Sequence, residues 1–177
     1  MYNQIKDIWT SCLSCQLNKD QPSRLIKTHK KSLQQSNEIW HTINADFMYV
    51  DKEYIFVMID EYSKNVVATC CKTQNSPTLL YILLKNFSLI RFSKILKLEN
   101  GPAFIAKTVT DYLKSVGVEQ QFSSPHNHKS NALVERFNRT LRSAIKIYKE
   151  QLLIMTVFHF AYAYNRSKSL STSLSPA

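Results

Sequence analysis

The sequence predicts an α/β fold in which helices flank a mixed sheet of five strands. Three apolar segments follow one another with short connections between residues 39 and 72, as in an antiparallel meander. Beyond residue 75, segments with helical spacing alternate with short strand-like segments, which is typical of parallel strands in a sheet. The chain has 177 residues and 44% hydrophobic content, enough for one domain with its own core.

The first three strands are predicted from their apolar patterns. Residues 39–50 alternate between apolar and polar side chains through their middle. Residues 54–62 form a near-continuous apolar run, typical of a central strand, with a turn at 60–64. Residues 65–72 are rich in β-branched side chains, which favours a third strand.

The second half begins with a helix at Ser76, where Pro77 favours a first turn. We then expect a strand over 94–99, one helix over 102–117 closed by Gly117, and a strand over 118–123. A loop over 123–130 precedes a long helix over 131–150. A final apolar helix over 152–166 includes a run of 13 residues, short of the roughly 20 that span a membrane; we expect a buried helix.

Positive charge is concentrated at the two ends of the chain. The net charge is +10, but residues 37–125 hold 9 basic and 9 acidic groups. Residues 1–36 hold 6 basic and 2 acidic groups, and residues 126–177 hold 8 and 2. A basic C-terminal third predicts a directed binding surface for an acidic partner, nucleic acid or an anionic surface.

Three carboxylates occupy related places in this layout. Asp46 lies in the first strand, Glu99 ends the fourth strand, and Glu135 lies near the start of the long helix. Asp46 and Glu99 become neighbours if these strands pair in parallel, at the sheet edge where α/β proteins place their reaction sites. Each residue also has a structural interpretation: a hydrogen-bonded core acid, a solvated acid, and an ion pair of Glu135 with Arg139.

Four stretches together resemble the catalytic core of retroviral and LTR-retrotransposon integrases, the gypsy-type group most closely. They are WHTINADF, YIFVMIDEYSK, ENGPAF and SSPHNHKSNALVERFNRTL. The resemblance covers about residues 38–150, and the tail AYNRSKSLSTSLSP resembles the end of the same core. It implies a ribonuclease-H-like fold over 37–177 and a DNA-integrating activity, 3′-end processing and strand transfer, which acts in the nucleus. A ribonuclease acting on RNA–DNA hybrids shares the fold but lacks these stretches.

The resemblance also implies a chemistry of the DDE type. Its triad of two Asp and one Glu, with thirty-five residues before the last, corresponds to Asp46, Glu99 and Glu135. In the family these acids hold two divalent ions, Mg²⁺ or Mn²⁺, that stabilise the attacking and leaving oxygens of a phosphodiester. Asp46 would bridge the ions, and each Glu would hold one.

Glu99 departs from the family pattern, which is Asp-Asn-Gly-Pro where this chain has Glu-Asn-Gly-Pro. The carboxylate stands one methylene further from the backbone. A displacement of about 1 Å at a reacting centre can cost roughly a hundredfold in rate. We therefore expect impaired polynucleotidyl transfer, with Mn²⁺ tolerated better than Mg²⁺. A catalytically inactive nucleic-acid-binding relic, or a domesticated element, is the alternative.

A basic stripe is predicted on the long helix. Spaced at 100° per residue, five side chains fall within about 40° of one line: Glu135, Arg139, Arg142, Lys146 and Lys149. A phosphate backbone could follow this stripe, although a solvated face is the simpler explanation for any one residue. A separate apolar flank should face the core: Val134, Phe137, Leu141, Ile145 and Tyr148.

The loop before the long helix meets DNA in the family, which implies contacts from Lys129, Ser130 and Asn131. Here the loop departs from the usual SSPYHPQSNG, and Ala132 replaces its glycine. His126 and His128 lie in the same loop. A pair of histidines there is more typical of a solvent-facing loop than of a metal site.

Cys12 and Cys15, spaced as Cys-x-x-Cys, resemble the second half of the integrase N-terminal zinc module. The two histidines of that module are missing upstream, and structural zinc needs four ligands. We therefore expect residues 1–36 to be a remnant of the module plus a linker, without zinc. The polar opening MYNQIKD indicates no secretory segment, so thiols are expected in place of disulfides. The family also oligomerises through its core, and no membrane partner is expected.

Overall fold

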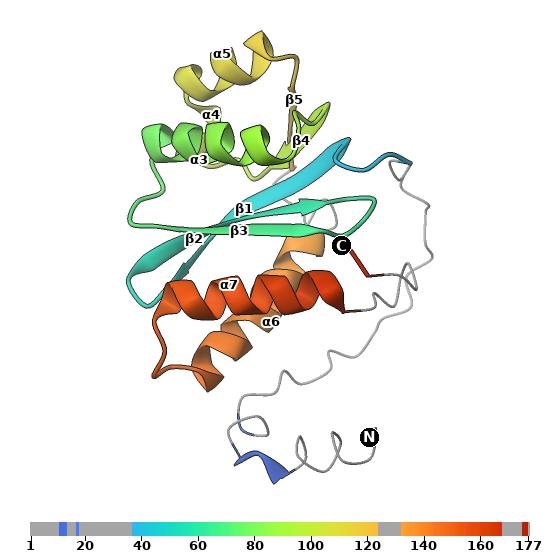
Figure 1. Ribbon diagram of the computed structural model, residues 1–177. Coiled ribbons are helices and arrows are strands. Elements are labelled where there is room, and N and C mark those ends of the chain that lie inside the picture. The colour runs from blue at the N-terminus through green and yellow to red at the C-terminus, as the bar shows by residue number, and fades with distance from the viewer. Residues whose placement is uncertain (1–10, 14–16, 18–36, 124–131, 168–174, 177) are drawn as a thin grey trace.

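The computed structural model describes residues 11–13, 17, 37–123, 132–167 and 175–176. Five strands form one sheet in the order β3-β2-β1-β4-β5 (Figure 1). Their bounds are β1 Thr42–Val50, β2 Glu53–Asp60, β3 Val66–Cys71, β4 Ile95–Leu98 and β5 Glu119–Phe122. The first three strands pair antiparallel, whereas β4 and β5 extend the sheet in parallel from β1. The predicted mixed sheet is confirmed.

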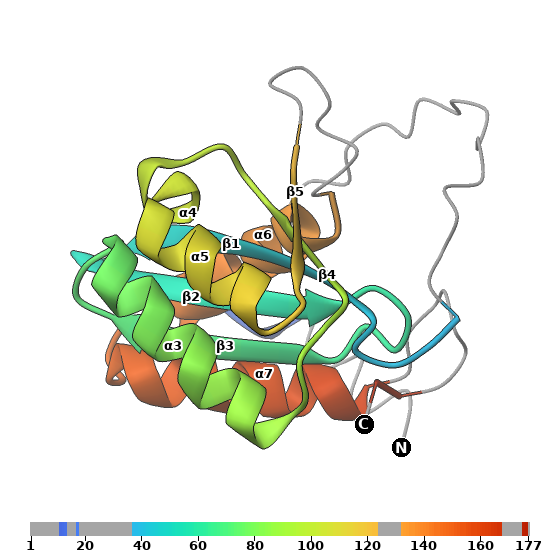
Figure 2. The ribbon, with the colours of Figure 1, turned by 90° about the horizontal axis from the view of Figure 1, so that it is seen from above.

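Helices cover both faces of this sheet, as Figure 2 shows from above. They are α3 Ser76–Leu89, α4 Pro102–Ile105, α5 Lys107–Ser115, α6 Ala132–Ile147 and α7 Leu153–Arg166. Helices α3, α4 and α5 lie on one face, and α6 and α7 lie on the other (Figure 1). No helix in the described part of the chain combines the length and apolar character that a bilayer span requires.

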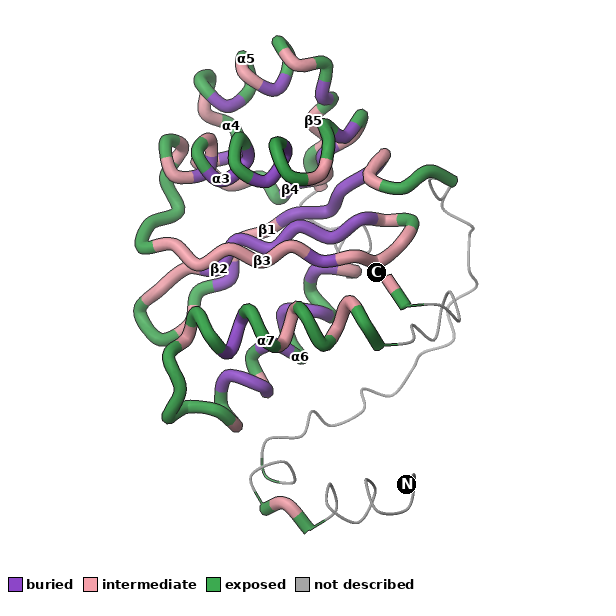
Figure 3. Tube along the Cα trace, viewed as in Figure 1, coloured by how far each residue is buried: buried purple, intermediate pink, exposed green. Residues whose placement is uncertain are grey.

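Each face of the sheet has its own buried core. Ile43 and Ala45 of β1 contact the core beneath α3 and α5, whereas Met48 contacts the core beneath α6 and α7. Figure 3 shows the buried stretches in the sheet and on the inner sides of the helices. Because successive side chains of a strand alternate between faces, Asp46 points to the face that α6 covers.

The turn after β2, predicted over residues 60–64, is organised by Asp60. Its side chain is fully buried and accepts hydrogen bonds from the backbone N–H of Trp40 at 2.9 Å and of Ser63 at 2.8 Å. The Ser63 hydroxyl donates a third at 2.6 Å. A buried carboxylate with three donors is well compensated, so Asp60 holds the turn.

Helix α3 starts and α5 stops where the sequence predicts, and the cap from Asn75 was not predicted. Helix α3 begins at Ser76, and the side chain of Asn75 caps it by accepting the Thr78 N–H at 3.0 Å. Gly117 follows α5 with φ +75°, a conformation in which a side chain is strained. The predicted glycine stop is therefore confirmed.

The single helix predicted over 102–117 is wrong, because the chain breaks at Ala106. There ψ is 133°, which separates α4 from α5. The carbonyl of Phe104 accepts a hydrogen bond from the side chain of Gln120 at 3.1 Å, outside the helical pattern. The break lets Phe104 of α4 and Val109 of α5 both face the core.

The last helix is also not buried as predicted. In α7 only Thr156 and Val157 are buried, and several large apolar side chains are more than 45% exposed: Ile154, Met155, Phe158 and Tyr162. Tyr148 is likewise 52% exposed, because α6 ends at Ile147 and no longer directs it toward the sheet. The other four residues of the predicted core flank of α6 are buried.

Helix α7 closes one edge of the sheet through Asn165. Its side-chain amide donates to the carbonyl of Val66 and accepts from the Val66 N–H, both at 2.9 Å. These bonds occupy the start of edge strand β3, where unpaired backbone groups invite pairing with other chains. Cys70 and Cys71, further along β3, are both thiols.

Candidate active site

The register of β1 and β4 brings Asp46 and Glu99 to the same level. The two strands pair in parallel, with Asn44 opposite Lys97. Two residues further along each strand stand Asp46 and Glu99, and Glu99 directly follows the last residue of β4. The predicted neighbourhood therefore depends on a parallel pairing that the structure contains.

Asp46 is only partly exposed, and its charge is costly there. Burial, the largest cause, together with the nearby carboxylates of Glu99 and Glu135, raises the pKa of this carboxyl from 3.8 to about 7. A hydrogen bond from the N–H of Phe47, at 2.7 Å, and the charge of Arg142 act in the opposite direction. Both Glu99 and Glu135 are thus near enough to Asp46 to act on its charge.

Helix α6 supplies the third acid in its first turn, where Glu135 is exposed. The three acids share one region beside the middle of β1 and the carboxyl end of β4, but they do not form a closed ligand set. Within the described residues, no group of three or more His, Cys, Asp or Glu side chains stands ready to hold a metal ion. Electrostatic coupling acts over longer distances than metal ligation, so the two observations agree.

The donors nevertheless suit a hard dication. Carboxylate oxygens are the ligands that Mg²⁺ and Mn²⁺ prefer. A cation beside Asp46 would offset the repulsion that raises the pKa of this carboxyl. The chemistry of the residues fits a divalent ion, and the side chains would have to draw together to bind one.

The pKa of Asp46 predicts that the metal-free fold loses stability as pH rises. The folded state holds the proton up to about pH 7, whereas the unfolded chain releases it near 3.8. The loss of folding stability is therefore absent below about pH 4, grows between pH 4 and 7, and reaches its full size above pH 7. Three pKa units correspond to about 4 kcal/mol; after a discount for solvent access we expect about 1–3 kcal/mol.

Asp46→Asn should therefore be more stable than the wild type at pH 8 and no more stable at pH 4, without metal. Urea denaturation at the two pH values measures the difference. Asp111 is exposed on α5. Asp111→Asn is therefore the control and should leave the dependence of stability on pH unchanged. Parallel profiles for wild type and Asp46→Asn would contradict the prediction.

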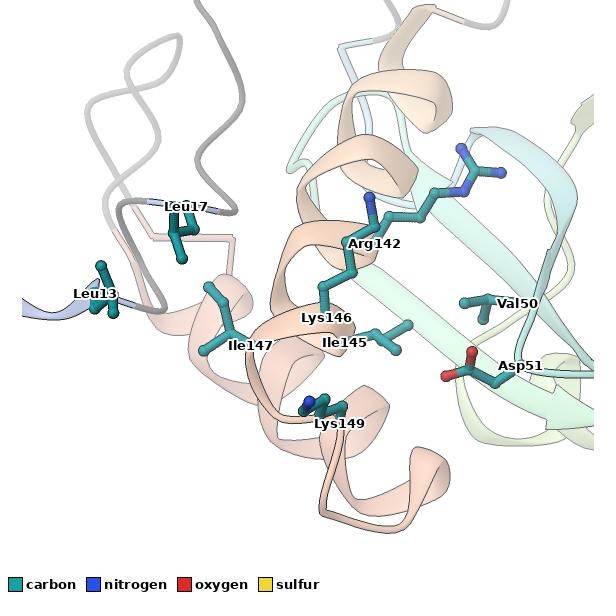
Figure 4. Close-up of a pocket in the computed structure, with 9 residues that line it drawn as sticks. All are labelled: Leu13, Leu17, Val50, Asp51, Arg142, Ile145, Lys146, Ile147 and Lys149. Carbon is teal, nitrogen blue, oxygen red and sulfur yellow. The ribbon is translucent and has the colours of Figure 1, made fainter.

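The predicted basic stripe is exposed along α6. Arg139, Arg142 and Lys146 are exposed on α6, and Lys149 is exposed in the turn just beyond its end at Ile147. Arg142 and Lys146 also line a cavity of about 610 Å³, with Asp51 at the end of β1 among its lining residues (Figure 4). The stripe therefore begins at Glu135 and continues into a concave surface.

Other predicted residues lie outside the described part of the chain. These are Lys129, Ser130 and Asn131, the histidines His126 and His128, and Cys15 of the zinc-module remnant. Their roles stay predictions. Of the Cys-x-x-Cys pair only Cys12 is described.

The motif after Glu99 has a packing role. Gly101 directly precedes α4, and a side-chain carbon there would lie 3.2 Å from the ring of Phe104. That ring stacks on Phe47 with centroids 5.5 Å apart. Gly101 thus lets the chain pass close to the core directly after Glu99.

Three residues near the acids were missed from the sequence. Lys97 lies two residues before Glu99 and forms an ion pair with Glu61 at 2.7 Å. Asn44 lies two residues before Asp46 and is buried, as is Asn138 on α6. The alternation around Asp46 could have drawn attention to Asn44, but no sequence signal separates Asn138 from the other polar residues of α6.

Comparison with known proteins gives a consistent family. The model of the integrase core domain matches residues 34–128. The Pol polyprotein of Ovine maedi visna related virus (strain South Africa) is 27% identical over 141 residues, which are 80% of this chain and 12% of that protein. The chain thus spans about an eighth of the relative it matches.

Two solved structures share the fold. The simian T-cell lymphotropic virus intasome, in complex with the PP2A regulatory subunit B56 gamma, has a TM-score of 0.73 and 19% identity, covering 98% of this chain and 64% of that one. The HTLV-2 integrase catalytic core domain, in complex with magnesium in a trimeric form, has a TM-score of 0.66 and 18% identity. The match covers 77% of this chain and 93% of that one. The expected ribonuclease-H-like fold is confirmed by these matches.

Proposed function

This chain belongs to the integrase core domain family, and we propose that it is the catalytic core of an enzyme that processes DNA 3′ ends and joins them to target DNA. The observation that supports this most is that the charges of Glu99, after a strand end, and of Glu135, in the first turn of a helix, both act on Asp46. Such a site suits an in-line displacement at a phosphodiester.

Each acid has a distinct role in this proposal. Asp46 lies in the sheet, and both other acids act on its charge. It would bridge two Mg²⁺ or Mn²⁺ ions, while Glu99 and Glu135 would each complete one site. When bound, the ions supply positive charge at the attacking and leaving oxygens. The chain's residues hold that charge in place and position the DNA backbone along α6.

The alternative is a nucleic-acid-binding relic without catalysis, and one specific observation favours it. Glu99 stands at the level of Asp46 with a side chain one methylene longer than the family pattern has. We propose that the protein acts in the nucleus and that its family group is the gypsy type. We also expect residues 1–36 to bind no zinc.

The test is a strand-transfer and disintegration assay on labelled oligonucleotides, with Mg²⁺ or Mn²⁺. The proposal predicts joined or resolved products that require the dication and disappear with a chelator. DNA binding without products under either ion would favour the relic.

Arg142 should contribute to DNA affinity through a phosphate contact. It is exposed on α6 and near Asp46. Arg142→Ala should weaken binding several-fold at low salt and reduce the slope of log affinity against log salt by about 1. Fluorescence anisotropy at several salt concentrations measures both. Lys114→Ala, an exposed cation on α5, is the control; equal slopes for Arg142→Ala and wild type would exclude the contact.

The apolar surface of α7 is the proposed surface for self-association. Ile154, Phe158 and Tyr162 recur at four-residue spacing, so they share one side of the helix, and each is more than half exposed. A second copy of the chain would cover them, as the trimeric form of the HTLV-2 core suggests by analogy. Phe158→Glu should raise the dissociation constant at least tenfold, measured by sedimentation velocity. Leu89→Glu, 74% exposed at the end of α3, should change it little.

A further inference from the structure

Two buried asparagines near the acids have an unpaired polar atom. Asn44 is 2% exposed and Asn138 is 5% exposed. Within the described residues, Nδ2 of Asn44 and Oδ1 of Asn138 have no hydrogen-bond partner. A buried amide without its bonds destabilises a fold, and such groups in native proteins call for a functional or solvent explanation.

Asn44 lies directly beside Asp46 on the sheet. The two residues are two apart in β1, so both side chains point to the α6 face, about 6–7 Å apart along the strand. On the neighbouring strand, Lys97 is level with Asn44 but is already paired with Glu61. The donor of Asn44 therefore remains available at the edge of the acid site.

Asn138 lies on α6 between two residues whose charges act on Asp46. Glu135 and Arg142 both act on the charge of Asp46, and they are seven residues apart on α6, about two turns. Asn138 lies between them, three residues after Glu135 and four before Arg142, on the same side of the helix. Unlike these two, it is buried, so it lies beneath them, toward the sheet.

The fold satisfies a comparable amide elsewhere. Asn86 on α3 is 3% exposed, yet its amide donates to the sulfur of Met58 at 3.3 Å. Among the buried polar side-chain atoms of the described residues, the hydroxyls of Ser93, Tyr112 and Thr156 are also unpaired. Asn44 and Asn138 are the two unpaired amides in this set, and both lie on the face that carries the acids. One offers a donor and the other an acceptor.

We propose that Asn44 and Asn138 are positioning residues that hold the ion-bound form of the acid site, an inference that rests on the proposed function. The N–H₂ group of Asn44 donates to a carboxylate oxygen of Asp46. The Oδ1 of Asn138 accepts from a water bound to the divalent ion. Partners around metal ligands of this kind orient the ligands and tune affinity.

The test uses Asn44→Leu and Asn138→Leu in the full chain, with Asn86→Leu as the matched control. Removing an unpaired buried amide should raise the metal-free Tm by about 2–6 °C. The same variants should bind Mn²⁺ about ten- to a hundredfold more weakly, by electron paramagnetic resonance of free Mn²⁺. Asn86→Leu should leave Mn²⁺ affinity unchanged. Asn44→Ala and Asn138→Ala repeat the affinity measurement with smaller side chains if leucine disrupts folding.

The Mn²⁺ affinities of the wild type and the variants test this inference separately from the proposed function. If the wild type binds Mn²⁺ and the four variants bind it equally well, the asparagines are structural and the inference is overturned alone. If the wild type binds no Mn²⁺, both the metal site and the inference are overturned. A drop in Mn²⁺ affinity in Asn86→Leu as large as in the others would also overturn it, because the loss would then reflect general destabilisation.

Discussion

Asp46→Asn is expected to lower strand transfer by at least about a thousandfold while the metal-free protein becomes more stable above pH 7. The change keeps the shape of the side chain and the acceptor that bonds the N–H of Phe47. It removes the only one of the three acids that lies in the sheet and is coupled to both others. Groups that stabilise charge in a transition state are typically worth a hundred- to a thousandfold each, and a residue shared by two ions should reach at least the upper value.

In Asp46→Asn, strand-transfer activity is expected to fall while stability rises, and this combination distinguishes a lost ligand from misfolding. A misfolded variant would lose both activity and stability, whereas removal of a costly buried charge should lose activity alone. Thermal melts with and without Mn²⁺ provide a second measurement, since a ligand that binds only the folded state raises Tm. We expect Mn²⁺ to stabilise the wild type but not Asp46→Asn. Activity in Asp46→Asn within tenfold of wild type would exclude this residue as an ion ligand.

The sheet could be predicted from the sequence because its determinants are local. Alternation in β1 and the apolar run of β2 reflect which sides of a strand are buried. The helix start at Ser76, followed by Pro77, and the stop at Gly117 depend on single residues. The break at Ala106 was missed because it follows from a contact with Gln120 on β5. The exposure of α7 was missed because an apolar sequence alone does not indicate what covers it.

The candidate site could also be predicted only in part from the sequence. Asp46, Glu99 and Glu135 could be proposed because their residue types and spacing match a family pattern, and the parallel register of β1 and β4 brings the first two level. Asn44 and Asn138 could not, because an unpaired amide is a property of the packed structure. Their identity as asparagine shows neither burial nor a missing partner.

Glu99→Asp is expected to raise strand transfer with Mg²⁺ by about ten- to a hundredfold. Glu99 directly follows β4, so its backbone is fixed by the strand and the extra methylene must be absorbed by the side chain alone. A displacement of about 1 Å at a reacting centre costs up to roughly a hundredfold, and Mg²⁺ demands near-ideal octahedral geometry. Shortening the side chain restores the distance from backbone to carboxylate that the family pattern uses.

The same reasoning predicts that the gain depends on the ion. We expect a smaller gain with Mn²⁺ than with Mg²⁺, because an ion less strict in its geometry already tolerates the longer side chain. Rates of joining of a labelled oligonucleotide under each ion measure the ratio. Glu119 is an exposed acid at the start of β5, level with Ile95 and therefore at the opposite end of the strands from Glu99. Glu119→Asp is the control for shortening an exposed acid away from the site and should change neither rate. If Glu99→Asp were slower than wild type with both ions, the site would be built around the longer side chain, and Glu99 would be a ligand adapted to its place instead of an impairing substitution.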